Sequence, residues 1–234
     1  MPTSSPRVAI VDYGMGNLYS VQRACEHVGL ESSITTSPDD VRAMDGVILP
    51  GVGSMPDAMR VLETTGLADA IREVVERGTP FLGVCLGLQL LMTDGSEFGA
   101  HSGLGIIPGR VERLAGHDEQ GAPLKVPHIG WNAVNRVAGR ENSWADTPLD
   151  GVPDRTLMYF VHSYRVIPAD PAVSIATTQY GDIEFCSAIA HDRIFACQFH
   201  PERSGPDGLG LYARFAATLS GDDAHSIAQQ RSVG

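Results

Sequence analysis

The chain has 234 residues, 43% of them hydrophobic, and a formal net charge of −11. This length and composition allow one substantial core and predict a single α/β domain. The negative charge disfavours nucleic acid or an anionic membrane as a general partner. No apolar segment is long enough to span a bilayer, and no signal-peptide pattern is present, so we expect a cytoplasmic protein.

The first half of the sequence alternates apolar runs with segments of helical spacing. Strands are predicted at residues 7–13, 33–36, 46–50 and 81–85, and helices at residues 17–28, 55–64 and 67–77. Continuous apolar strands that alternate with helices favour a mostly parallel central sheet flanked by helices. Ligands of such sheets bind beyond the carboxyl ends of the strands, where Asp12, Gly51 and Cys85 fall.

The second half of the sequence consists mainly of short strand-like segments and predicts an additional antiparallel or mixed sheet portion. Its short strand-like segments are residues 109–114, 131–137, 157–165, 173–179 and two runs within 184–199. A final helix is predicted at residues 208–219 and closes a domain that spans residues 1–219. Residues 220–234 are predicted to form a polar, frayed C-terminal tail.

Cys85 is the most informative residue, because an apolar run ends abruptly at its thiol, between Gly83 and Gly87. This pattern predicts a strand, a sharp turn and a helix, with the sulfur held at the turn. The positive end of a helix dipole favours the thiolate form of such a residue. A buried core thiol is the alternative interpretation of Cys85 taken alone.

A second segment supplies a base for the thiol and a carboxylate that can orient this base. Within residues 196–204, an apolar strand ends at His200, which is followed by Pro201 and Glu202. Because Pro201 disfavours a helix at the preceding residue, an extended chain would carry His200 and Glu202 to the same side. Glu202 could then orient the imidazole of His200, which completes a Cys–His–Glu triad with Cys85.

These two motifs, at residues 83–89 and 199–202, together resemble those of the class I (triad) glutamine amidotransferases. Within that superfamily, further segments look like the glutaminase subunits of imidazole glycerol phosphate synthases: residues 12–18, 50–54, 127–132 and 159–164. The resemblance runs from about Val8 to Leu219 and implies a flavodoxin-like α/β fold.

The resemblance implies glutamine hydrolysis through a cysteine thioester. Cys85 would attack the side-chain amide and release ammonia, while His200 shuttles protons and Glu202 holds the imidazole. The oxyanion hole needs two donors: the backbone N–H of Leu86 would be one, and the other would come from the 51–53 loop, at Val52 or Gly53. The loop that contains Gly53 is expected to need a peptide rotation for activity, which its glycines permit.

The same resemblance implies the residues that bind glutamine. Gln89 and Glu97 would neutralise the zwitterion, Gly51 would line the site, and backbone contacts are expected near Tyr159 and Ser163. For an isolated Glu or Gln, a solvated surface position is the more common interpretation. The motif alone therefore assigns Gln89 and Glu97 to the substrate.

A partner is also implied, because the chain has no barrel pattern of its own. The resemblance predicts a heterodimer with a (β/α)8-barrel cyclase, which uses the ammonia to make imidazole glycerol phosphate and aminoimidazole carboxamide ribotide in histidine biosynthesis. The residues expected at or near this interface are Asn17, His128, Trp131, Asn132 and His162. We expect cyclase ligands to be coupled to glutaminase activity.

No cofactor or metal site is predicted, since the four cysteines lack the paired spacing of zinc ligands. Arg203 stands where lysine is frequent in the resembled family. Two alternatives stay open: a glutaminase for another acceptor or a free-standing glutamyl hydrolase, and a catalytically silent binding or redox-sensing subunit. Capture of a barrel cyclase would separate the first interpretation from both.

Overall fold

The computed structural model describes residues 5–118 and 120–219. The strands are β1 (Arg7–Val11), β2 (Glu31–Thr35), β3 (Gly46–Gly51), β4 (Phe81–Cys85), β5 (Met92–Gly95), β6 (His101–Ser102), β7 (Ile107–Arg113), β8 (His128–Arg136), β9 (Thr156–His162), β10 (Tyr164–Pro168), β11 (Ser174–Tyr180), β12 (Ile183–His191) and β13 (Ile194–Cys197). The helices are α1 (Leu18–His27), α2 (Pro38–Ala43), α3 (Met55–Thr64), α4 (Leu67–Glu76), α5 (Leu86–Leu90) and α6 (Gly205–Leu219), with 3-10 turns η1 (Pro171–Val173) and η2 (Pro201–Arg203).

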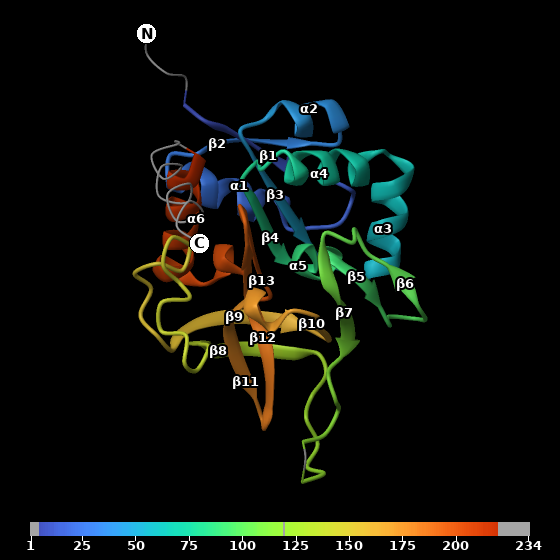
Figure 1. Cartoon of the computed structure of the whole chain (residues 1–234), viewed down its shortest axis with the longest axis vertical. Coiled ribbons are helices and arrows are strands. Elements are labelled where there is room, and N and C mark those ends of the chain that lie inside the picture. Colours follow the sequence, from blue (N-terminus) through green and yellow to red (C-terminus); the bar gives the residue numbers. More distant parts are fainter. Residues whose placement is uncertain (1–4, 119, 220–234) are drawn as a thin grey trace, which may run out of the picture.

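A parallel sheet forms the centre of the fold, as the sequence predicts. Its strand order is β2-β1-β3-β4-β13, and β3, β4 and β13 run side by side in the same direction. Helices α3 and α4 cover one face, and α1 and α6 pack on the other (Figure 1). Because both faces are covered, the central strands β3 and β4 are almost wholly apolar, whereas the edge strand β2 is mostly polar.

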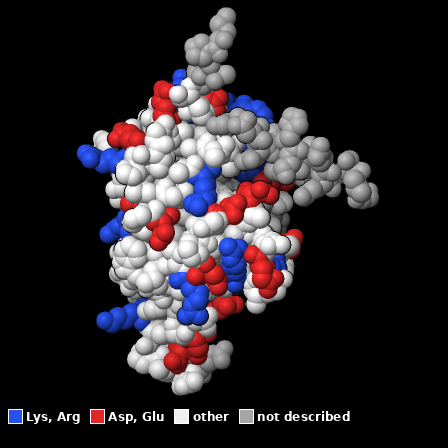
Figure 2. Space-filling model, turned by 90° about the vertical axis from the view of Figure 1, so that its left-hand side faces the viewer, with Lys and Arg blue, Asp and Glu red and all other residues white. Residues whose placement is uncertain are grey.

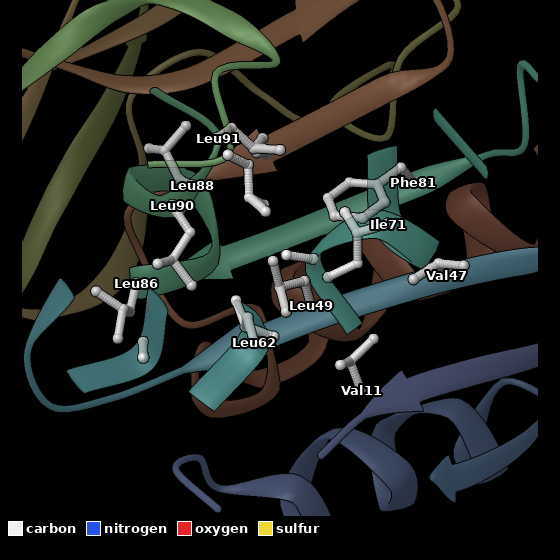
Figure 3. Close-up of a cluster of buried hydrophobic side chains, with 14 of the residues drawn as sticks. Val11, Val47, Leu49, Leu62, Ile71, Phe81, Leu86, Leu88, Leu90 and Leu91 are labelled. Atoms are coloured by element: carbon white, nitrogen blue, oxygen red, sulfur yellow. The ribbon is translucent and has the colours of Figure 1, made fainter. Parts of the chain in front are cut away.

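Two apolar clusters hold the helices against the sheet. In the cluster shown in Figure 3, Leu49 and Phe81 of the sheet lie beside Leu62 of α3 and Ile71 of α4. All four side chains are fully buried. Burial of a side chain of this size stabilises the fold by about 1.5–3 kcal/mol, which sets the position of the strands that carry the site.

Beyond β13 the sheet continues with antiparallel strands, and this confirms the predicted mixed portion. Strand β12 pairs antiparallel with β13, β10 and β11, and β8 pairs with β9 and β11. Residues 157–165 do not form one strand, as the sequence pattern suggested. The chain breaks at Ser163, because β9 pairs with β8 whereas β10 pairs with β7.

Other differences from the predicted elements are local. Helix α2 and the short strands β5 and β6 were not predicted, and α6 begins at Gly205 instead of residue 208. A start signal for α2 is present in the sequence, since the Ser37 side chain accepts a hydrogen bond from the Asp40 N–H and Pro38 follows it. The predicted tail at residues 220–234 lies outside the described residues, and the domain boundaries stay a prediction.

The described surface carries charges of both signs. On the face in Figure 2, acidic and basic side chains are interspersed. Several charged side chains of the described residues form ion pairs, such as Arg42 with Glu73. No helix within the described ranges is long and apolar enough to cross a membrane.

Candidate active site

Cys85 lies at the turn between β4 and α5 and has an unusual backbone conformation. Its φ is 55° and its ψ is −106°, a region that residues other than glycine rarely adopt. The turn is tight because α5 packs directly against β3: a Cβ atom at Gly87 would lie 1.8 Å from the Leu49 carbonyl oxygen. The predicted strand, sharp turn and helix around the thiol are therefore confirmed.

The end of β3 lies beside the thiol, since Gly51 pairs with Cys85 in the parallel register. A Cβ atom at Gly51 would lie 2.0 Å from the Tyr13 hydroxyl and 2.9 Å from the Cβ of Leu86, so only glycine fits there. The Tyr13 hydroxyl donates a hydrogen bond of 2.9 Å to the Pro50 carbonyl oxygen. Burial and the nearby Cys85 charge raise the pKa of Tyr13, which keeps it a donor.

The expected oxyanion loop follows directly. Gly53 has a φ of +94°, and Val52 is exposed to 43%. The Leu86 N–H stands at the start of α5, immediately after the thiol, among the orphan donors of a helix N-terminus. These positions are compatible with an oxyanion hole, and the assignment of Val52, Gly53 and Leu86 to it stays a prediction.

His200 and Glu202 form a buried pair. The Nδ1 atom of His200 lies 2.8 Å from Oε1 of Glu202, and the two side chains are 5% and 1% exposed. Burial alone would lower the pKa of His200, but the charge of Cys85 and the contact with Glu202 raise it to about 10. The ring is therefore held protonated beside the thiol, as a proton donor to a leaving group requires.

The sulfur of Cys85 has two polar neighbours that the sequence motifs did not indicate. The Val161 carbonyl oxygen lies 3.8 Å from Sγ, and Nε2 of Gln198 lies 3.6 Å from it. A signal for Gln198 existed, because it stands two residues before His200, and alternate residues of an extended chain point to the same side. Val161 contributes only a backbone atom, for which no side-chain signal exists.

Gln89 and Glu97 are both buried close to these elements. Nε2 of Gln89 donates to the Tyr164 carbonyl oxygen at 3.1 Å and to Oε1 of Gln198 at 3.0 Å. Oε2 of Glu97 accepts a hydrogen bond of 2.7 Å from the Met55 N–H at the start of α3. Burial raises the pKa of Glu97. Contact of either residue with glutamine stays a prediction.

Tyr159 supports His200 through its backbone. Its carbonyl oxygen accepts from the His200 N–H at 2.8 Å, and its N–H donates to the Ser204 hydroxyl at 3.0 Å. The guanidinium carbon of Arg203 lies 4.3 Å from the centre of the Tyr159 ring. The Ser163 carbonyl oxygen accepts from the Leu114 N–H. The roles of Tyr159 and Ser163 in glutamine binding stay predictions.

The residues expected at a partner interface have different surroundings. Asn17 and Trp131 are exposed, whereas His128 and His162 are 1% and 5% exposed. Nδ1 of His128 lies 3.0 Å from Nε2 of His162, and Nε2 of His128 lies 2.8 Å from Oδ1 of Asn132. A partner would meet the two buried rings only across neighbouring side chains, and the interface itself stays a prediction.

The other cysteines differ from Cys85 in their surroundings. Burial raises the pKa of Cys25 and Cys186 to about 11, and burial also raises that of Cys197. These groups stay protonated thiols at neutral pH. Within residues 5–118 and 120–219, no group of three or more His, Cys, Asp or Glu side chains is placed to hold a metal ion.

Comparison with known proteins agrees with this geometry. The family model described as "Glutamine amidotransferase class-I" matches residues 9–218. Imidazole glycerol phosphate synthase subunits HisH of Synechococcus sp. (strain JA-2-3B'a(2-13)) and Geobacter sulfurreducens are 46% and 47% identical, over 89% of this chain and 91% and 97% of theirs.

Among solved structures, PurLQS from Thermotoga maritima matches with a TM-score of 0.67 at 20% identity, over 92% of this chain and 99% of that chain. A glutamine amidotransferase from the same organism matches with a TM-score of 0.58 at 14% identity, over 99% of this chain and 87% of that one. These two likenesses support the fold. The family model and the HisH relatives show more: the chain belongs to the class-I glutamine amidotransferases and, within them, to the HisH group.

Proposed function

We propose that this chain is the glutaminase subunit of an imidazole glycerol phosphate synthase, and that Cys85, His200 and Glu202 are its catalytic residues. The observation that carries the proposal is the strained turn at Cys85 beside the buried His200–Glu202 pair. The HisH relatives, at 44–47% identity, support the choice of acceptor pathway, histidine biosynthesis. The cytoplasmic location expected from the sequence stays a prediction.

In the first half of the reaction, the Cys85 thiolate attacks the carboxamide carbon of glutamine. A C–S bond forms, and the electron pair of the carbonyl moves onto its oxygen, which the N–H groups of Leu86 and the 52–53 loop stabilise. When this intermediate collapses, the C–N bond breaks and the leaving nitrogen takes a proton from His200. The products are ammonia and a glutamyl thioester. The raised pKa of His200, about 10, keeps that proton available at neutral pH.

In the second half, the imidazole that has lost its proton acts as a base. It removes a proton from water, which attacks the thioester carbon, and the thiolate of Cys85 leaves as glutamate forms. Glu202 contacts Nδ1, so the opposite ring nitrogen, Nε2, is the one that exchanges protons. The second proton of the water leaves the new carboxyl group for solvent, and the cycle returns the thiolate and the imidazolium.

The outer face of the β8–β9 hairpin supports a partner close to this chemistry. Ile129, Trp131 and Leu157 are large apolar side chains that are 59%, 52% and 55% exposed. Trp131 stands opposite Tyr159 in the hairpin register, and the Tyr159 carbonyl oxygen holds the His200 N–H. A cyclase barrel on this face would contact the strand that supports the catalytic base, which gives a route for coupling.

The test is glutamate release from glutamine by the chain alone, and then with a separately purified barrel cyclase and its nucleotide ligand. Strong stimulation by both additions is expected, because the oxyanion loop needs rearrangement before it can act. Full activity of the lone chain would favour a free-standing glutaminase. A lack of activity throughout would favour another acceptor or a silent triad.

A further inference from the structure

Gln198 links the proposed nucleophile to a proposed substrate-binding residue. It follows β13 directly, has no exposed surface, and its backbone N–H donates to the Ser187 carbonyl oxygen at 2.9 Å. Its side-chain oxygen, Oε1, accepts from Gln89, while its side-chain nitrogen, Nε2, lies 3.6 Å from the Cys85 sulfur. One buried amide therefore touches two parts of the site at once.

The orientation of this amide follows from its neighbours. Gln89 donates to the Tyr164 carbonyl oxygen, which can only accept, so the nitrogen of the Gln89 amide must face this region. The second N–H of that nitrogen then needs an acceptor, and Oε1 of Gln198 supplies it. Nε2 of Gln198 is consequently the atom that faces Cys85, and it can only donate.

A donor at this position favours the charged form of the sulfur. An N–H group that points at sulfur stabilises a thiolate more than a thiol, because hydrogen bonds to ions are the stronger ones. The Val161 carbonyl oxygen, 3.8 Å away, has the opposite effect, since it can only accept from a protonated thiol. The titratable groups around the sulfur are His200, Tyr13 and Cys197, each electrostatically coupled to Cys85.

We propose that Gln198 is a positioning residue for glutamine hydrolysis: its amide nitrogen holds the Cys85 sulfur as a thiolate, and its oxygen fixes the Gln89 side chain for glutamine. This inference rests on the proposed glutaminase function. Both N–H donors of Gln89 are used by protein oxygens, which leaves Oε1 of Gln89 free to accept from the ammonium group of glutamine. Gln198 thereby couples reactivity to substrate recognition.

The test compares the variants Gln198→Glu and Gln198→Leu with the unaltered chain. Iodoacetamide labelling of Cys85 is followed against pH by peptide mass spectrometry, which separates Cys85 from the three other thiols. Replacing the donor by a carboxylate should raise the labelling midpoint by about one pH unit, and removing it should raise the midpoint by less. In the complex with the cyclase, kcat/KM should fall roughly 10- to 100-fold.

Steady-state kinetics separate the effect of the Gln198 variants on glutamine binding, seen in KM, from their effect on the reaction of Cys85, seen in kcat. Because Gln89 loses its anchor, Gln198→Leu should raise KM for glutamine as well as lower kcat. A double variant with Gln89→Leu should show a KM effect smaller than the sum of the two single effects on a free-energy scale. Gln198→Glu retains an acceptor for Gln89, so its KM should change less than that of Gln198→Leu.

Ser187→Ala is the matched control. Ser187 is fully buried, its carbonyl oxygen accepts from the Gln198 backbone, and its hydroxyl has no hydrogen-bond partner within the described residues. This variant should keep the labelling midpoint, kcat and KM of the unaltered chain. If Gln198→Leu and Gln198→Glu lower only thermal stability, with the same midpoint and KM, the inference is wrong.

The inference and the proposed function fail separately. If the unaltered complex releases no more glutamate than Cys85→Ala, the glutaminase proposal is wrong. The labelling experiment still reports on the contact between Gln198 and Cys85 in that case. If the complex is active but the Gln198 variants have the labelling midpoint and KM of the unaltered chain, only the positioning role is overturned.

Discussion

At Cys85 the backbone conformation is strained. A residue with a side chain at φ 55° and ψ −106° costs about 1–3 kcal/mol relative to a relaxed conformation. The conformation persists because β4 and α5 are both buried and fix the turn from either side. The strain aims the sulfur toward the end of the sheet, where His200 and Gln198 lie.

Cys85→Ala should abolish glutamine use and keep ammonia use. The methyl group cannot form a thioester, whereas the cyclase needs only ammonia. We therefore expect the complex with Cys85→Ala to make imidazole glycerol phosphate from an added ammonium salt and not from glutamine. Product formation is measured with each nitrogen source at equal complex concentration. Loss of both activities, with the complex still assembled, would contradict the prediction that Cys85 is needed to release ammonia but not to use it.

The same substitution should change the acidity of His200. In the unaltered chain, burial lowers the pKa of His200, while Cys85 and Glu202 raise it to about 10. Without the sulfur, Glu202 alone opposes burial, so the pKa should fall toward its ordinary value of 6.5. NMR titration of the imidazole signals measures this shift, with His200→Gln used for assignment. An unchanged titration would show that Glu202, and not the thiolate, holds the proton.

At the scale of elements, the site depends on how closely α5 approaches β3. Gly87→Ala places a methyl group 1.8 Å from the Leu49 carbonyl oxygen, a backbone atom that cannot move without shifting β3. We expect the free energy of unfolding to fall by about 3 kcal/mol, at the upper end of overpacking costs. Urea unfolding followed by circular dichroism measures the change.

Gly116→Ala is the matched control, because a Cβ atom there meets nothing within 4 Å. This substitution should leave stability nearly unchanged or raise it slightly. If Gly87→Ala were as stable as this control, α5 would not be packed as tightly as the structure indicates.

The parallel half of the fold was predictable from sequence, because its central strands β3 and β4 are apolar on both faces and its helices have regular spacing. The break at Ser163 was not, since strand partners far apart in sequence decide where β9 ends and β10 begins. Cys85, His200 and Glu202 were recognisable from two short motifs. The spacing of Gln198 from His200 was a signal that the motifs did not use, and the Val161 carbonyl oxygen had no side-chain signal, because its contact with the sulfur appears only in three dimensions.

Binding of the cyclase to the β8–β9 hairpin should raise the glutaminase activity of the site. Trp131→Ala removes a large, half-exposed ring from its outer face without emptying the core. We expect unchanged stability of the lone chain, weaker binding to the cyclase and reduced stimulation of glutamate release. Calorimetric titration and the glutaminase assay measure the two effects. Tyr19→Ala, at a side chain 76% exposed on α1, is the control for loss of a surface aromatic ring.

At the scale of the whole molecule, stability should depend on pH through His162. Burial, with smaller effects of His128 and His200, lowers the pKa of His162 to about 3, whereas the unfolded chain titrates near 6.5. The neutral ring therefore makes its full contribution to the free energy of unfolding above pH 6.5. This stabilisation is lost as the pH falls from 6.5 toward 3. Below pH 6.5 the loss is about 1.4 kcal/mol per pH unit for one group.

His162→Gln should remove this part of the pH dependence. The variant should start less stable at pH 7.5, yet lose less free energy of unfolding than the unaltered chain between pH 6.5 and 5, as urea unfolding at each pH will measure. His27→Gln, at an exposed position, should leave the slope unchanged.

An equal slope in His162→Gln and the unaltered chain would mean that the His128–His162 pair, with its nitrogens 3.0 Å apart, keeps a shared proton in the folded state. The outer nitrogens of these rings face the Asn132 and Tyr164 oxygens, so a neutral pair would leave two lone pairs facing each other. That outcome would therefore assign a buried positive charge to the β8–β9 hairpin, beneath its outer face.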